Sequence, residues 1–178
     1  MVIDIFNNSN FDTLEKISLD DSKGDSLFLD KKNGSYINFD EKVLENIYKA
    51  LKDGFCDTLC AVDTIIKKSD TIYLIEFKNQ KRNSIKKYEI YSKAMESLAV
   101  LRKCIKNLDK YRVVLIVLYK DFEEEGYKKI GKTVSLKNAP KDFKLCRYEK
   151  VIFDEIYTLD KSTFLKFKNY FAFATNWE

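Results

Sequence analysis

The chain has 178 residues, of which 45% are hydrophobic and 14% aromatic, so we expect one domain with one sizeable core. It contains no histidine, which excludes Cys-His zinc sites, Ser-His-Asp hydrolases and Cys-His nucleophiles. The net charge is +4, but residues 1–45 carry ten acidic and five basic side chains, whereas residues 76–112 carry four acidic and eleven basic ones. The positive charge is therefore concentrated in the middle of the chain.

Membrane and secretion signals are not apparent in the sequence. No run approaches the about 18 apolar residues of a membrane span, and the first residues, MVIDIFNNSNFD, lack a basic region followed by an apolar one. The four cysteines form no C-x-x-C pair. These patterns predict a soluble, cytoplasmic protein with reduced thiols and no membrane partner.

Hydrophobic periodicity predicts the elements of the first half. Residues 26–39, SLFLDKKNGSYINF, predict a hairpin that turns at Asn33-Gly34. Over residues 40–53 the apolar side chains fall on one helical stripe. Residues 58–66 and 71–79 are apolar on both faces and predict an antiparallel hairpin inside a sheet.

The second half continues the alternation of helices and strands. Residues 84–106 predict a long helix that covers the sheet, and residues 111–119, YRVVLIVLY, predict a fully buried strand. A further strand is expected within residues 150–159, followed by a helix that begins near Asp160 or Ser162. The expected fold class is α/β, with a mixed central sheet flanked by helices.

Charged residues interrupt the apolar hairpin. Side chains alternate across a strand, so Glu76 and Lys78 share one face, and Asp63 on the partner strand can lie beside Glu76. Two partly buried carboxylates repel each other unless a cation is present, and Mg²⁺ or Mn²⁺ suits oxygen ligands. A second interpretation stays open, in which Glu76 and Lys78 form a solvent-facing ion pair on an edge strand and Asp63 is an ordinary strand-end residue.

Residues 39–119 resemble the PD-(D/E)XK nuclease superfamily, with a layout similar to Holliday junction resolvases and restriction-type endonucleases. Asp63 resembles the motif aspartate, IEFK (75–78) resembles the I-E-x-K strand, and DEKVLENIYKALKDGF (40–55) is similar to the first helix of the family. Gln80 matches a polar residue found in some branches. Val62 replaces the family's proline before the aspartate.

The resemblance implies a restriction-endonuclease-like core over about 39–119, within a single domain whose peripheral elements are 1–38 and 120–178. It implies a Mg²⁺-dependent endonuclease, a phosphodiesterase that cuts DNA or RNA. Asp63, Glu76 and the Phe77 carbonyl would hold Mg²⁺ or Mn²⁺, and Lys78 would orient the attacking water.

The helix glutamate and the substrate contacts are less determined. Taking 3.6 residues per turn, Glu41 lies nearer the apolar stripe than Glu45, so Glu41 is the expected outer ligand, although Glu45 stays open. Four basic residues that follow the charged strand are expected to contact phosphates of the nucleic acid. These are Lys81, Arg82, Lys86 and Lys87.

Several settings use such a nuclease: defence, a toxin domain, or recombination and repair. The alternative function is a catalytically inactive module of the same fold that binds nucleic acid or a protein partner. The choice between DNA and RNA, and between a monomer and a homodimer, is left open by the sequence.

Overall fold

A computed structural model of the chain describes residues 5–6, 10–20, 25–26, 36–51, 59–80, 82–120 and 143–167. The strands are β1 (Phe11–Asp12), β2 (Leu19–Asp20), β3 (Asp25–Ser26), β4 (Tyr36–Asn38), β5 (Thr64–Lys68), β6 (Thr71–Lys78), β7 (Arg112–Tyr119) and β8 (Glu155–Asp160). The helices are α1 (Leu14–Ile17), α2 (Leu44–Leu51), α3 (Lys87–Cys104) and α4 (Lys161–Phe167), together with a π-helical turn η2 (Phe39–Val43) and 3₁₀ turns η3 (Arg82–Ser84), η4 (Leu108–Lys110) and η6 (Leu145–Tyr148).

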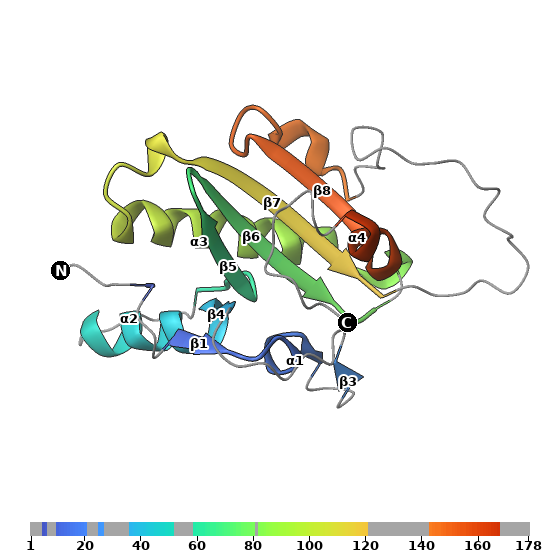
Figure 1. Cartoon of the computed structure of the whole chain (residues 1–178), viewed down its shortest axis with the longest axis horizontal. Coiled ribbons are helices and arrows are strands. Elements are labelled where there is room, and N and C mark those ends of the chain that lie inside the picture. The colour runs from blue at the N-terminus through green and yellow to red at the C-terminus, as the bar shows by residue number, and fades with distance from the viewer. Residues whose placement is uncertain are drawn as a thin grey trace, which may run out of the picture.

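Six of the strands form one mixed sheet in the order β1-β4-β5-β6-β7-β8 (Figure 1). The pairs from β1 to β6 are antiparallel, whereas β6/β7 and β7/β8 are parallel. The expected α/β class, with a mixed sheet flanked by helices, is confirmed. No helix in the described part of the chain is long and apolar enough to cross a membrane.

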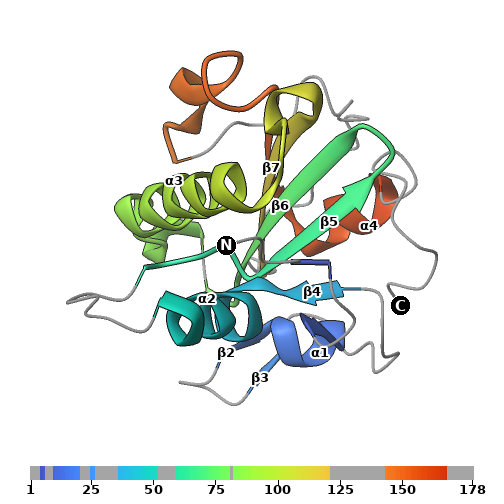
Figure 2. The same cartoon turned by 90° about the vertical axis from the view of Figure 1, so that its left-hand side faces the viewer.

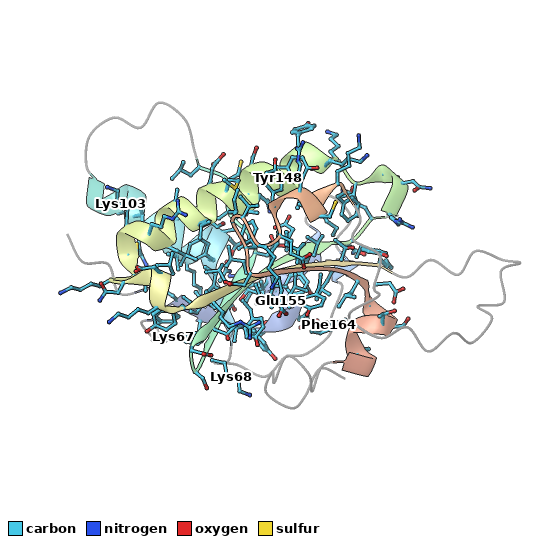
Figure 3. The ribbon with its side chains drawn as sticks, turned by 90° about the horizontal axis from the view of Figure 1, so that it is seen from above. Lys67, Lys68, Lys103, Tyr148, Glu155 and Phe164 are labelled. Atoms are coloured by element: carbon cyan, nitrogen blue, oxygen red, sulfur yellow. The ribbon has the colours of Figure 1, made fainter. Side chains whose placement is uncertain are left out.

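The two faces of the sheet are covered by different helices (Figure 2). Ile72 and Leu74 of β6 belong to the core that α2 and α3 cover, whereas Ile75 and Phe77 belong to a second core with Phe164 of α4. Figure 3 shows Tyr148 on the α3 side of the sheet and Phe164 on the other. Because side chains alternate along a strand, even-numbered residues of β6 face α3.

The predicted hairpin of residues 58–66 and 71–79 is present as β5 and β6, which pair antiparallel from Thr64↔Ile75 to Lys68↔Thr71. The turn is shorter than expected, because Lys68 still belongs to the strand. Ser69 adopts a left-handed backbone conformation, with φ of 51°, as a two-residue hairpin loop requires. A tight hairpin fixes the register of the two strands.

The first of these strands begins at Thr64 rather than at residue 58, for a visible reason. The backbone N–H of Val62 donates to Ser97 Oγ at 2.9 Å, and the N–H of Cys60 donates to a Glu96 carboxylate oxygen at 2.6 Å. Side chains of α3 therefore accept hydrogen bonds from backbone N–H groups that would otherwise donate to a neighbouring strand. Asp63 consequently lies just ahead of the strand.

The prediction that β4 forms a hairpin with the residues just before it, within 26–39, is wrong. This strand has β1 on one side and β5 on the other, so both of its edges are paired. The predicted turn at Asn33-Gly34 lies outside the described residues. Because β4 pairs with β5 and η2 follows β4 directly, the start of that helical segment lies next to β5.

The other predicted elements are present with shifted ends. The buried strand β7 and the long helix α3 lie where periodicity placed them, although α3 begins at Lys87 after the 3₁₀ turn η3. The later strand begins only at Glu155. Asp160 caps α4, since its Oδ1 accepts from the Thr163 N–H at 2.6 Å.

Candidate functional site

Asp63 is held in one orientation by its neighbours. Its backbone carbonyl accepts from the Phe39 N–H at 3.1 Å, which ties it to the junction between β4 and η2. Its side-chain Oδ2 accepts from the Phe77 N–H at 2.5 Å, in the position that a further residue of β5 would otherwise take. The other carboxylate oxygen, Oδ1, is therefore the one directed at the space between β6 and α3.

Glu76 and Lys78 continue the apolar row of β6 that faces α3. Glu76 is 1% exposed, and Lys78 Nζ lies 2.9 Å from its Oε1. Lys78 also lies 3.8 Å from Glu89 of α3. Because β6 has β5 and β7 on its two sides, the interpretation as a solvent-facing pair on an edge strand is wrong.

Lys93 of α3 joins the carboxylates from opposite the sheet, and the sequence interpretation did not identify it. Its Nζ lies 3.1 Å from Asp63 Oδ1, 3.1 Å from Glu76 Oε1 and 3.7 Å from Asp40 Oδ2. The Asp63 and Glu76 oxygens are thus separated by at most twice 3.1 Å, less than the about 8 Å beyond which two ligands could not share an ion. We call Asp40, Asp63, Glu76 and Lys93 the carboxylate cluster.

Within this cluster, the carboxylate of Glu76 is in an electrostatically unfavourable environment. Burial, reinforced by the negative charge of Asp63, raises the pKa of Glu76 to about 7, although Lys93 and Lys78 oppose the shift. Both of its carboxylate oxygens are buried. The ammonium groups of Lys78 and Lys93 approach Oε1 within ion-pair distance, whereas Oε2 is a buried acceptor that lacks a donor among the described residues.

The pKa values of Lys93 and Asp40 are also raised, for different reasons. Burial alone would lower the pKa of Lys93, but the charges of Asp63, Glu76 and Asp40 outweigh it and raise that pKa, so the ammonium stays charged. Burial also raises the pKa of Asp40, with Lys93 opposing and Asp63 adding to the shift. Glu76 is the most deeply buried carboxylate of the cluster.

Glu41 does not join the carboxylate cluster. Its Oε2 accepts from Asn38 Nδ2 at 2.8 Å and lies 3.4 Å from Lys16 Nζ, and its side chain is 59% exposed. Glu45 pairs with Lys49 at 2.6 Å on the exposed side of α2. Asp40 reaches the cluster instead, because the helix opens with the π-helical turn η2, whose wider turn changes the phase that 3.6 residues per turn predicts.

The remaining predicted residues lie around the cluster. Phe77 contributes its N–H to Asp63, while its side chain is buried on the opposite face of the sheet. Gln80 is half-buried two residues beyond β6, and among the described residues the ion pairs of the carboxylate cluster do not include it.

Basic side chains lie at the start of α3. Arg82, Lys86 and Lys87 are exposed, whereas Lys81 lies outside the described residues. Lys86 Nζ is 3.3 Å from Glu89, which in turn contacts Lys78. Of these exposed cations, Lys86 is therefore linked through Glu89 to Lys78 of the buried site.

The donor set of the cluster suits a hard divalent cation. With Glu89 included, four carboxylates contact three ammonium groups, those of Lys78, Lys86 and Lys93, which leaves one negative charge in excess when all are ionised. Mg²⁺ and Mn²⁺ prefer such oxygen ligands. In the described ranges, no group of three or more His, Cys, Asp or Glu is already arranged around a metal-sized centre, and Lys93 stands between the carboxylates.

The raised pKa of Glu76 predicts a pH-dependent stability in the absence of divalent ions. Between pH 4.5 and about 7 the folded protein keeps a proton on Glu76 that the unfolded chain releases, so the free energy of unfolding falls as the pH rises through this window. We expect a loss of up to a few kcal/mol. Urea unfolding in EDTA from pH 4.5 to 8 should show this slope in the wild type and a flatter one in Glu76→Gln.

The matched control for this measurement is Glu45→Gln, which makes the same change in an exposed carboxylate on α2. It should keep the slope of the wild type. Parallel curves for the wild type and Glu76→Gln would show that Glu76 titrates normally.

Comparison with known proteins finds no matching family model, no matching curated protein and no matching solved structure.

Proposed function

We propose that the protein is a metal-dependent nuclease that hydrolyses phosphodiester bonds in DNA or RNA, with a restriction-endonuclease-like core. The observation that carries this proposal is Glu76, a carboxylate that is 1% exposed, has Asp63 beside it, and has an oxygen without a hydrogen-bond donor. Burying such a group destabilises a fold unless cations compensate its charge, which makes it a suitable ligand for a divalent ion. Its place between β5 and β7, with Lys78 two residues later, suits the D…E-x-K arrangement of this superfamily.

Asp63 and Glu76 are the residues that would hold Mg²⁺ or Mn²⁺, with Asp40 as the nearest further carboxylate. When bound, the ion supplies an activated water and neutralises charge on the scissile phosphate. The Phe77 N–H keeps Asp63 Oδ1 directed at the site, because it occupies the other oxygen of that carboxylate. Orientation of this kind keeps two repelling carboxylates in a productive position.

Lys78 is suited to act on the reacting groups. Its side chain is only 12% exposed, and its ammonium lies between Glu76 and Glu89, so it is fixed rather than solvated. From there it can hold the attacking water and stabilise negative charge that develops on the phosphate. A compact ammonium suits this role better than a planar guanidinium.

Exposed cations at the start of α3 suit a polyanionic substrate. Arg82, Lys86 and Lys87 are the described residues that would contact phosphates, without reading bases. The second candidate function is a module of the same fold that binds nucleic acid or a protein without cutting. It is favoured by the ion pairs of Lys93, which neutralise part of the carboxylate charge without any metal.

A cleavage panel tests the proposal and separates the two candidates. The purified protein is incubated with supercoiled DNA, branched DNA and total tRNA in Mg²⁺, Mn²⁺ or EDTA, and its thermal unfolding is followed with and without Mn²⁺. A nuclease should cut at least one substrate, only with the ion, and should gain stability as Mn²⁺ is added because the ion binds the folded state.

A protein that cuts none of the three substrates and shows no Mn²⁺-dependent shift contradicts the nuclease and leaves the binding module as the remaining candidate. Stabilisation without cleavage would retain the ion site but contradict the nuclease activity on these substrates.

A further inference from the structure

Lys93 is the member of the carboxylate cluster that the proposed reaction does not require. Its Nζ contacts carboxylate oxygens from three separate parts of the chain: Asp40 in η2, Asp63 in the segment before β5, and Glu76 in β6. Two of these oxygens lie at 3.1 Å and the third at 3.7 Å. An ammonium group that contacts three carboxylates occupies the position that a metal ion ligated by the same oxygens would take.

The oxygens available to a cation are limited by the other contacts of the cluster. Asp63 Oδ2 accepts from the Phe77 N–H of the β6 backbone, so the oxygen that Asp63 directs at the site is Oδ1, which Lys93 contacts. Metal–oxygen distances of about 2.0 to 2.6 Å would place the ion within the space of that ammonium. Two positive charges at this separation repel strongly in a buried site.

We propose that the Lys93 ammonium is a built-in counter-ion that occupies the cation position, so that a divalent ion binds only when this side chain withdraws. The inference rests on the proposed function, because it concerns the same carboxylates. Lys93 is able to withdraw, since its side chain is long and unbranched and is 21% exposed. Ion binding is therefore weakened by the free energy of breaking the Lys93 contacts, and the metal-free fold is stabilised by the same contacts.

The contacts of α3 explain why Lys93 points into the cluster. Ser97, one turn further along the helix, is fully buried, and its hydroxyl accepts from the Val62 N–H and donates to the Lys93 carbonyl. This anchors the turn that carries Lys93 against the segment leading to Asp63. The position of the lysine backbone is thus independent of the ammonium contacts, which is what a side chain that exchanges with an ion needs.

The test measures Mn²⁺ binding without using activity. Wild type and Lys93→Met are stripped with EDTA, transferred to buffer and titrated with Mn²⁺ while thermal unfolding is followed. We expect Lys93→Met to unfold at a lower temperature than the wild type without the ion, and to bind Mn²⁺ about tenfold more tightly or better. Lys93→Gln, which keeps a neutral hydrogen-bond donor for Asp63, provides a second variant should the Met variant fail to fold.

The matched control is Lys103→Met, which removes one charge from an exposed position at the other end of α3 (Figure 3). It should leave the Mn²⁺ affinity unchanged. If the wild type binds Mn²⁺ but neither Lys93 variant binds it more tightly, Lys93 is a structural ion-pair partner and the inference fails while the proposed function stands. If neither the wild type nor the variants respond to Mn²⁺, the proposed function fails and this inference with it.

Discussion

Asp63→Asn and Glu76→Gln are each expected to lower cleavage by at least about a thousandfold and to remove the Mn²⁺-dependent gain in stability. Both substitutions keep the shape of the side chain but remove a charge that an ion would require. The Asp63→Asn variant still has a side-chain oxygen that can accept from the Phe77 N–H, so the local backbone should not change. Cleavage rates at saturating Mn²⁺ and thermal unfolding with and without Mn²⁺ measure the two effects on the same preparations.

Glu155→Gln is the control for this pair. Glu155 pairs with Arg112 at 2.5 Å and accepts from the Tyr157 hydroxyl at 2.6 Å, so it is a paired carboxylate of the same sheet outside the cluster. Its variant should cut at the rate of the wild type. Circular dichroism establishes that each variant is folded, and cleavage that survives in folded Asp63→Asn and Glu76→Gln would show that these carboxylates are only structural.

Lys78→Met should behave differently from the carboxylate variants. We expect it to keep Mn²⁺ binding and to lose about a hundredfold to ten-thousandfold in the single-turnover rate, because its proposed role lies in the chemical step. Its removal takes one positive charge from beside Glu76, which should, if anything, favour the ion. Single-turnover cleavage at saturating Mn²⁺ and a Mn²⁺ titration of stability separate the two effects.

Lys78→Arg is the informative companion variant. It restores the charge but not the compact ammonium, so it should recover only part of the rate. A Lys78→Met protein that cuts at the wild-type rate would remove Lys78 from the chemistry, and one that loses Mn²⁺ binding would place it in the support of the ion site.

The glutamate of the first helix shows where local reasoning reached its limit. Its choice depended on a phase of 3.6 residues per turn from Asp40 onwards, and that phase selected Glu41. The helix opens with a π-helical turn instead, held by the capping contact of Asn38 with the Glu41 N–H. That turn directs Asp40 towards Lys93 and leaves Glu41 with Lys16.

The sequence by itself determined the hairpin of β5 and β6, the buried strand β7, the long helix α3 and the shared face of Glu76 and Lys78. These features follow from periodicity and strand alternation, which are properties of neighbouring residues.

Only the tertiary structure decided that Asp63 lies ahead of its strand and that Lys93 enters the cluster from α3. Asp63 and Lys93 are 30 positions apart, and their contact depends on how α3 packs over the hairpin. No local pattern marks one lysine of a basic helix as partly buried, because its exposure is set by residues of other elements that the helix covers.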